Sequence, residues 1–134
     1  MSDLAKRAVA VEKHWHWVPG MRMLHPRMGP PRVLRVTRAG VWVAKEESFA
    51  SGFRVDEDDC VPDLSDPATL GCLLALVREA WGDQHLHVGR RIAGWGVWTS
   101  QSTPLPECVG KGDTEAEALV AALEAAERRE VSDG

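Results

Sequence analysis

The stretch "DPATLGCLLALVREAWG", residues 66–82, decides much of the fold because it carries the start, the body and the stop of an amphipathic helix. Asp66 is a preferred N-cap residue, and Pro67 suits the first helical position, where no N–H is needed. Apolar residues recur at helical spacing along one stripe, namely Leu70, Leu73, Leu74, Val77 and Trp81. Gly82 supplies a left-handed stop. The sequence therefore predicts a helix over 66–81 that packs across a sheet.

Two further helices are indicated near the ends of the chain. Thr114 and Glu117 have the spacing of a capping box, which marks a helix start. A narrow apolar stripe follows at Leu119, Leu123 and Ala126, so we predict a helix over 114–129. Leu4, Ala8 and Val11 recur at helical spacing and favour a first helix over about 3–13, although Val9 and Val11 equally suit the start of a strand.

Strand-like segments lie between these helices at residues 32–37, 40–45, 48–55, 85–89 and 92–100. A short turn joins the first two into a hairpin, and 85–100 reads as a second strand pair, whereas 103–113 reads as a loop. Strand runs between helices are typical of an α+β fold. With 134 residues, we expect one α+β domain over 1–134. We predict an antiparallel sheet of about four to five strands, with the helices covering one face.

Composition narrows the functional class. No apolar run approaches the roughly 18 residues that span a bilayer, and the N-terminus lacks the apolar stretch of a secretory signal. We therefore expect a cytoplasmic protein without membrane contact. Three cysteines in a reducing compartment are expected as free thiols. The sequence has no nucleophile elbow and no phosphate-cradling loop, so we expect no enzymatic activity and assign no catalytic residue.

The segment "EKHWHWVPGM", residues 12–21, alternates histidine and tryptophan. On an extended chain Trp15 and Trp17 would face the core, and His14 and His16 would face the other way. His85 and His87 repeat this spacing, and four imidazoles are a ligand set for tetrahedral zinc. Ordinary polar faces of two strands explain the same histidines. We expect no cofactor, with zinc at these four residues as the alternative.

Six tryptophans and no tyrosine in a small chain favour an exposed aromatic surface that binds a partner. The candidate partner-binding residues are Trp15, Trp17, Met21, Arg22, Arg27, Trp42, Trp95 and Trp98. A net charge of -4 argues against a nucleic-acid binder, and we favour a protein partner. Single-stranded nucleic acid, held by tryptophan stacking and arginines, is the alternative. The methionines near Met21 suit either an adaptable surface or core filling. A half-covered sheet is also compatible with a homodimer.

Three segments carry a resemblance to known proteins: "HWHWVPGM" at 14–21, "VPDLSDPATLGCLLALVREAWGD" at 61–83 and "DTEAEALVAALEAA" at 113–126. In this order they resemble a group of small uncharacterised proteins encoded by tailed bacteriophages and prophages. The resemblance covers about a third of the chain and carries over no site residue. It implies a phage accessory protein that acts by binding a host or phage protein. Such accessory proteins include inhibitors of host defence.

Overall fold

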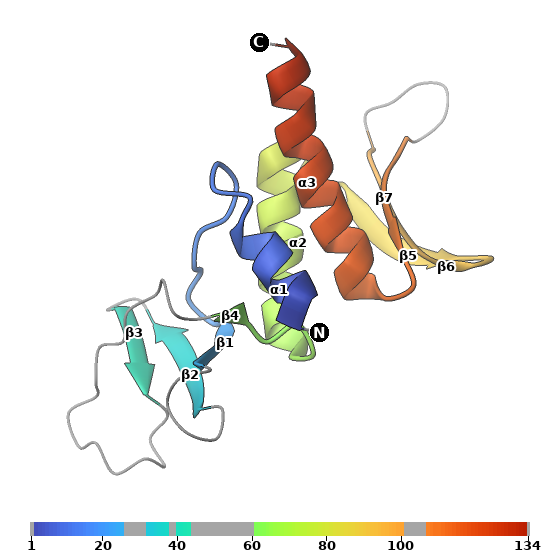
Figure 1. Cartoon of the computed structure of the whole chain (residues 1–134). Coiled ribbons are helices and arrows are strands. Elements are labelled where there is room, and N and C mark those ends of the chain that lie inside the picture. Colours follow the sequence, from blue (N-terminus) through green and yellow to red (C-terminus); the bar gives the residue numbers. More distant parts are fainter. Residues whose placement is uncertain (1, 26–31, 38–39, 44–60, 101–106, 134) are drawn as a thin grey trace.

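A computed structural model describes residues 2–25, 32–37, 40–43, 61–100 and 107–133 of the chain (Figure 1). The helices are α1 (Ser2–Val9), α2 (Pro67–Trp81) and α3 (Glu115–Asp133). The strands are β1 (Arg22–His25), β2 (Arg32–Thr37), β3 (Gly40–Val43), β4 (Val61–Pro62), β5 (His87–Arg91), β6 (Gly94–Trp98) and β7 (Cys108–Gly112). Among the described residues, no helix combines the length and the apolar character that a membrane span requires.

The strands form two antiparallel sheets, one in the order β3-β2-β1-β4 and one in the order β5-β6-β7. The predicted α+β class and both predicted hairpins, β2–β3 and β5–β6, are confirmed. The strands divide between two sheets, however, whereas we expected one. The strand predicted at 48–55 lies outside the described residues. The segment 103–113, which was expected to be a loop, contributes the strand β7 instead.

Helix α3 is the centre of the molecule. It packs on the β5-β6-β7 sheet and also contacts α2 and α1 (Figure 1). Its buried residues, which extend well beyond the narrow predicted stripe, are Ala116, Ala118, Leu119, Val120, Ala122, Leu123 and Ala126. The four alanines among them let neighbouring backbones approach closely. A helix with neighbours on several sides buries more than one stripe, which the sequence of α3 alone does not reveal.

The contact between α3 and β7 requires glycine. A Cβ built on Gly110 would lie 2.7 Å from the backbone nitrogen of Ala122, and one built on Gly112 would lie 2.8 Å from that of Ala118. Real Cβ atoms do not approach backbone this closely. The two glycines therefore set the distance between the helix and the sheet.

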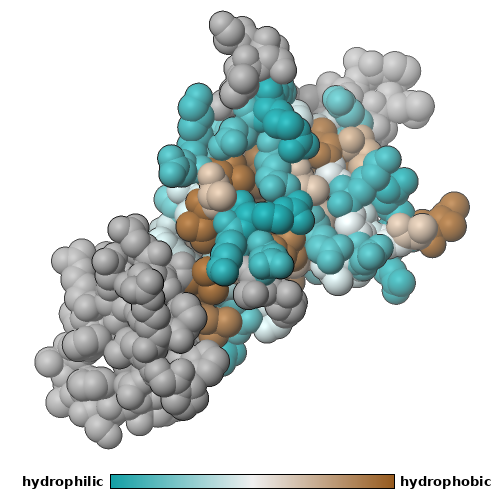
Figure 2. Space-filling view, viewed as in Figure 1, coloured by the Kyte–Doolittle hydropathy of each residue, from teal (hydrophilic) through white to brown (hydrophobic). Residues whose placement is uncertain are grey.

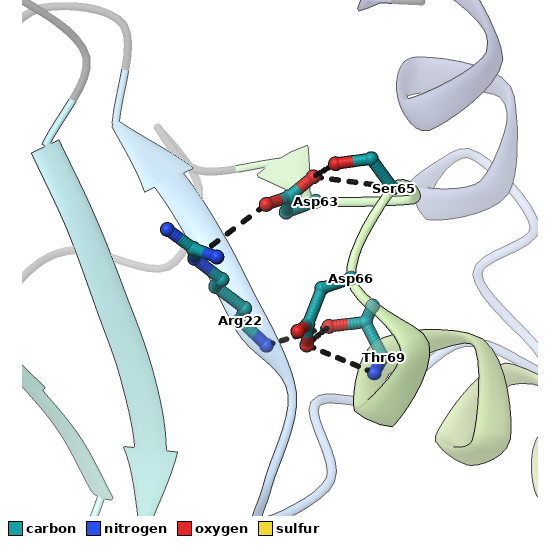
Figure 3. Close-up of polar contacts among 5 residues, drawn as sticks. All are labelled: Arg22, Asp63, Ser65, Asp66 and Thr69. Atoms are coloured by element: carbon teal, nitrogen blue, oxygen red, sulfur yellow. Dashed lines mark hydrogen bonds and ion pairs between the residues drawn. The ribbon is translucent and has the colours of Figure 1, made fainter.

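Helix α2 has the predicted boundaries and caps. Asp66 is its N-cap and accepts a hydrogen bond from the Thr69 N–H, and Gly82 adopts a left-handed conformation with φ of 63°. The fully buried Thr69 hydroxyl donates to Asp66 (2.8 Å) and accepts from the Arg22 backbone N–H (2.8 Å), as Figure 3 shows. Because Arg22 opens β1, this network joins the four-stranded sheet to the start of α2. The Arg22 guanidinium also lies 3.5 Å from Asp63, which follows β4.

The strand interpretation of residues 14–17 is wrong. After α1 the chain makes turns, with the Trp15 N–H donating to the Val11 carbonyl at 2.8 Å, and no strand begins before Arg22. Trp15 and Trp17 form an edge-to-face pair with ring centroids 5.2 Å apart, and both pack against the core. The alternation of histidine and tryptophan at 14–17 therefore does not mark the two faces of a strand. It places two tryptophan rings where they pack on one another.

We predict that Gly110→Ala destabilises the protein by about 1–3 kcal/mol, because the new methyl group is forced into the backbone of α3. Gly71→Ala is the matched control, since a Cβ at Gly71, which is exposed in α2, meets nothing within 4 Å. It is expected to stabilise the helix by roughly 0.5–1 kcal/mol. Urea unfolding measures both changes. Equal effects of the two variants would contradict the packing that we describe.

Candidate functional site

The strand register gives the β5-β6-β7 sheet an inner and an outer face. Gly110 and Gly112 face α3, so Lys111 between them points to the outer face. Val97 pairs with Gly110, points inward and is fully buried. By the same alternation His87, Gly89 and Arg91 in β5, and Gly96 and Trp98 in β6, belong to the outer face.

Two glycines seat the indole of Trp98 on this outer face. A Cβ built on Gly96 would lie 2.9 Å from Cη2 of Trp98, and one built on Gly89 would lie 3.6 Å from Cζ3. The six-membered ring therefore occupies the space above both glycines. The Arg91 stem lies beside it, with its Cδ 2.7 Å from the same Gly96 position. Glycine at 96 is needed because a methyl group there would displace both side chains.

His87 extends this aromatic surface. It pairs with Trp98 across the strands, and the two rings stack with centroids 5.7 Å apart and an interplanar angle of 21°. His87 is exposed and Trp98 is half-buried. Offset stacking of this kind is a favourable aromatic geometry. Two planar rings are thus held side by side on an accessible sheet face.

The charge on the three strands has one sign. Their sequences, HVGRR, GWGVW and CVGKG, contain Arg90, Arg91 and Lys111 but no aspartate or glutamate. All three cations are exposed. The ion pairs found in the described part of the chain, Arg7–Glu124, His16–Glu79 and Arg22–Asp63, involve none of them. A chain with a net charge of -4 therefore presents a locally positive face.

The tip of the β5–β6 hairpin adds an apolar group to these cations. Ile92 is fully exposed, at 110 % of its reference area, directly after Arg90 and Arg91. Figure 2 shows an apolar patch at this tip, at the right of the view. On the inner side of the same hairpin, the Arg90 guanidinium lies 5.8 Å from the ring centroid of Trp95. The tip therefore combines an exposed aliphatic side chain with two guanidinium groups.

Asp83 fixes the other end of the hairpin. Its buried carboxylate accepts hydrogen bonds from the backbone N–H and the hydroxyl of Ser100 (2.7 and 2.5 Å) and from the His85 N–H (3.0 Å). These bonds, those from Ser100 first, lower the pKa of Asp83 below its ordinary value of 3.8. Ser100 follows β6 and His85 precedes β5, so Asp83 holds together the strand ends that carry Trp98 and His87. The sequence contained no indication of this role.

The predicted partner-binding residues that the structure describes do not gather on one surface. Met21 is fully buried and fills the core, and Trp15, Trp17 and Trp95 pack against it. Arg22 pairs with Asp63, while Arg27 lies outside the described residues. Trp42 lies in β3, opposite Arg35. Of the predicted residues that the structure describes, Trp98 lies on the outer face, which it shares with three residues that the partner prediction did not contain, His87, Arg91 and Lys111.

The four predicted metal ligands are not brought together. Within the described ranges no three histidine, cysteine, aspartate or glutamate side chains gather at one point. His16 lies 3.5 Å from Glu79, whereas His87 stacks on Trp98. The backbone N–H of His85 is bonded to Asp83, and His14 is half-buried in the segment after α1. The structure therefore does not gather the four imidazoles into one ligand set among the residues that it describes.

Comparison with known proteins identifies no relative, since no protein-family model, no curated protein and no solved structure matches this chain. The candidate site is therefore defined by its geometry. It consists of the outer face of β5-β6-β7, with His87, Arg91, Trp98 and Lys111, together with the tip at Arg90 and Ile92.

The lowered pKa of Asp83 predicts a specific loss of stability in acid. The ionised carboxylate stabilises the fold above its unfolded pKa of about 3.8, and this contribution disappears as the pH falls through the lower folded pKa. Asp83→Asn should be less stable at pH 7 and should lose less unfolding free energy than the wild type below pH 3.8. Urea unfolding at a series of pH values measures this difference. Parallel pH profiles of the two proteins would contradict it.

Proposed function

We propose that this chain is a non-enzymatic binding protein that docks an anionic macromolecule on the outer face of its β5-β6-β7 sheet. The observation that carries the proposal is the chemistry of this face. Two exposed cations, Arg91 and Lys111, accompany two stacked rings on this face, and Arg90 lies next to them in the hairpin. The three strands carry no carboxylate to oppose these charges. Clustered charge of one sign raises the local concentration of an oppositely charged partner and speeds its association.

Two further features support a binding role. Tryptophan and arginine are enriched among the residues that anchor interfaces, and the tip presents Ile92 without any described neighbour covering it. The buried carboxylate of Asp83, in contrast, is engaged in three hydrogen bonds that hold the hairpin. That engagement supports an architectural role for Asp83 rather than a catalytic one.

The resemblance to small proteins of tailed bacteriophages and prophages suggests that this binding takes place in an infected bacterial cell. In that setting the protein acts in the host cytoplasm as an accessory factor, and inhibition of a host defence system is one such role. A host or phage protein with an acidic surface would fit the same face. A protein and a nucleic acid would both need the positive charge of this face. One experiment therefore tests the charge requirement, and another must identify the class of partner.

We predict that the folded protein is retained on immobilised heparin, a polyanion, in spite of its negative net charge. Arg91→Glu/Lys111→Glu should elute at markedly lower salt, because it reverses two charges on the outer face. The control, Lys6→Glu/Lys13→Glu, changes net charge equally at two other exposed lysines and should elute like the wild type. The salt concentration at elution is the measurement, with circular dichroism melts to verify folding.

Two results would contradict the proposal. If the wild type passes through heparin at low salt, the outer face does not bind a polyanion. If the control variant elutes as early as the face variant, retention reflects net charge and not this surface.

A further inference from the structure

We infer that the macromolecule bound on the outer face is a single-stranded nucleic acid, with its bases against the Trp98–His87 pair and its phosphates on Arg91 and Lys111. This inference rests on the proposed function and names the partner of that same face. It is argued from the rings, from the positions of the cations and from the hairpin tip.

The rings favour unpaired bases. The Trp98 indole is held over Gly89 and Gly96 and is flanked by the exposed His87 ring. The surface is therefore preorganised, so little side-chain freedom is lost when a planar ligand stacks on it. Every base has a planar face, so aromatic side chains bind single strands with little sequence preference. An acidic peptide has the charge to bind this face, but most of its side chains have no plane to stack on the rings.

The cations are placed to hold the backbone of a strand that passes over the rings. Arg91 lies two residues beyond Gly89 in β5, and Lys111 pairs with Gly96 in the neighbouring strand. The strands of a sheet are about 4.8 Å apart, so the cations and rings together extend over roughly 10 Å across the sheet. A bound strand thus meets a ring and a positive charge within the same short span. Such a combination of stacking groups and a positive track is typical of single-strand binding.

The hairpin tip extends this surface. Ile92 is exposed beside Arg90 and Arg91, and apolar side chains of nucleic-acid-binding proteins insert between neighbouring bases. A single strand allows such insertion at low cost, since no base pairs must be unstacked. In a duplex the base faces are covered by their neighbours. The geometry therefore favours a single strand over a duplex.

The test is fluorescence anisotropy with end-labelled 20-nucleotide oligo(dT) and oligo(U) at several salt concentrations. The wild type should bind both, with an affinity that falls as salt rises. Arg91→Glu/Lys111→Glu should weaken binding at least tenfold and make the slope of log K against log salt shallower by about 1.4, since each phosphate contact contributes roughly 0.7. The control, Lys6→Glu/Lys13→Glu, should retain the wild-type affinity and slope.

The stacking contribution is tested by His87→Leu and Trp98→Leu. Both should weaken binding severalfold at every salt concentration while leaving the salt slope unchanged, because they remove rings and no phosphate contact. Trp98 also covers two glycines, so a melting curve must accompany that variant. His87→Leu changes an exposed ring and tests stacking even where Trp98→Leu lowers stability.

The outcomes separate this inference from the proposed function. If the folded wild type binds neither oligonucleotide at low salt, or if a 20-base-pair duplex binds as tightly as the single strand, the inference is overturned. It is also overturned if His87→Leu and a stably folded Trp98→Leu both leave the affinity unchanged. Heparin retention that still depends on Arg91 and Lys111 would then preserve the anionic partner and indicate an acidic protein surface instead. Loss of both results would remove the proposed function as well.

Discussion

The close contact between α3 and β7 at Gly110 and Gly112 is the constraint on which the rest of the structure depends. Without side chains at these positions, the helix backbone lies directly on the strand, and the alanines of α3 fill the narrow space. This contact commits one face of the three-stranded sheet to the core. The opposite face has no described element packed on it, so its side chains are available to a partner.

Helix α2 connects the two sheets through polar groups at its ends. At its start, Asp66 and the buried Thr69 bind the backbone of Arg22, where the four-stranded sheet begins. At its end, Gly82 turns the chain and Asp83 binds Ser100, where the β5–β6 hairpin closes. Buried polar groups must be satisfied, so each network has a well-defined geometry. The polar networks at the two ends of α2 therefore help α3 to fix the orientation of the candidate face.

Local rules were sufficient for some elements and not for others. The caps of α2 and the two hairpins are encoded by adjacent residues, and these predictions are confirmed. Residues 14–17 were assigned wrongly because paired rings can alternate without a strand. The loop prediction for 103–113 misses β7, because the glycines of this strand add nothing to a hydrophobic pattern and instead allow α3 to pack closely. The sequence suggested His87 as a zinc ligand and Trp98 as a partner-binding residue. Only the strand register shows that the two rings stack on each other. Arg91 and Lys111 carry no sequence pattern that distinguishes them from other surface cations.

Glycine residues allow close packing on both faces of the β5-β6-β7 sheet. Gly110 and Gly112 admit the helix on the inner face, while Gly89 and Gly96 admit the Trp98 indole on the outer face. Glycine within strands is unfavourable, because it contributes no side-chain packing and loses much conformational freedom on folding. Trp98 offsets part of this cost by covering the two outer glycines. It therefore supports the sheet and faces the partner at once, whereas the exposed His87 ring contributes mainly to the surface. Substitution of His87 therefore tests the contact with the partner without removing the ring that supports the sheet.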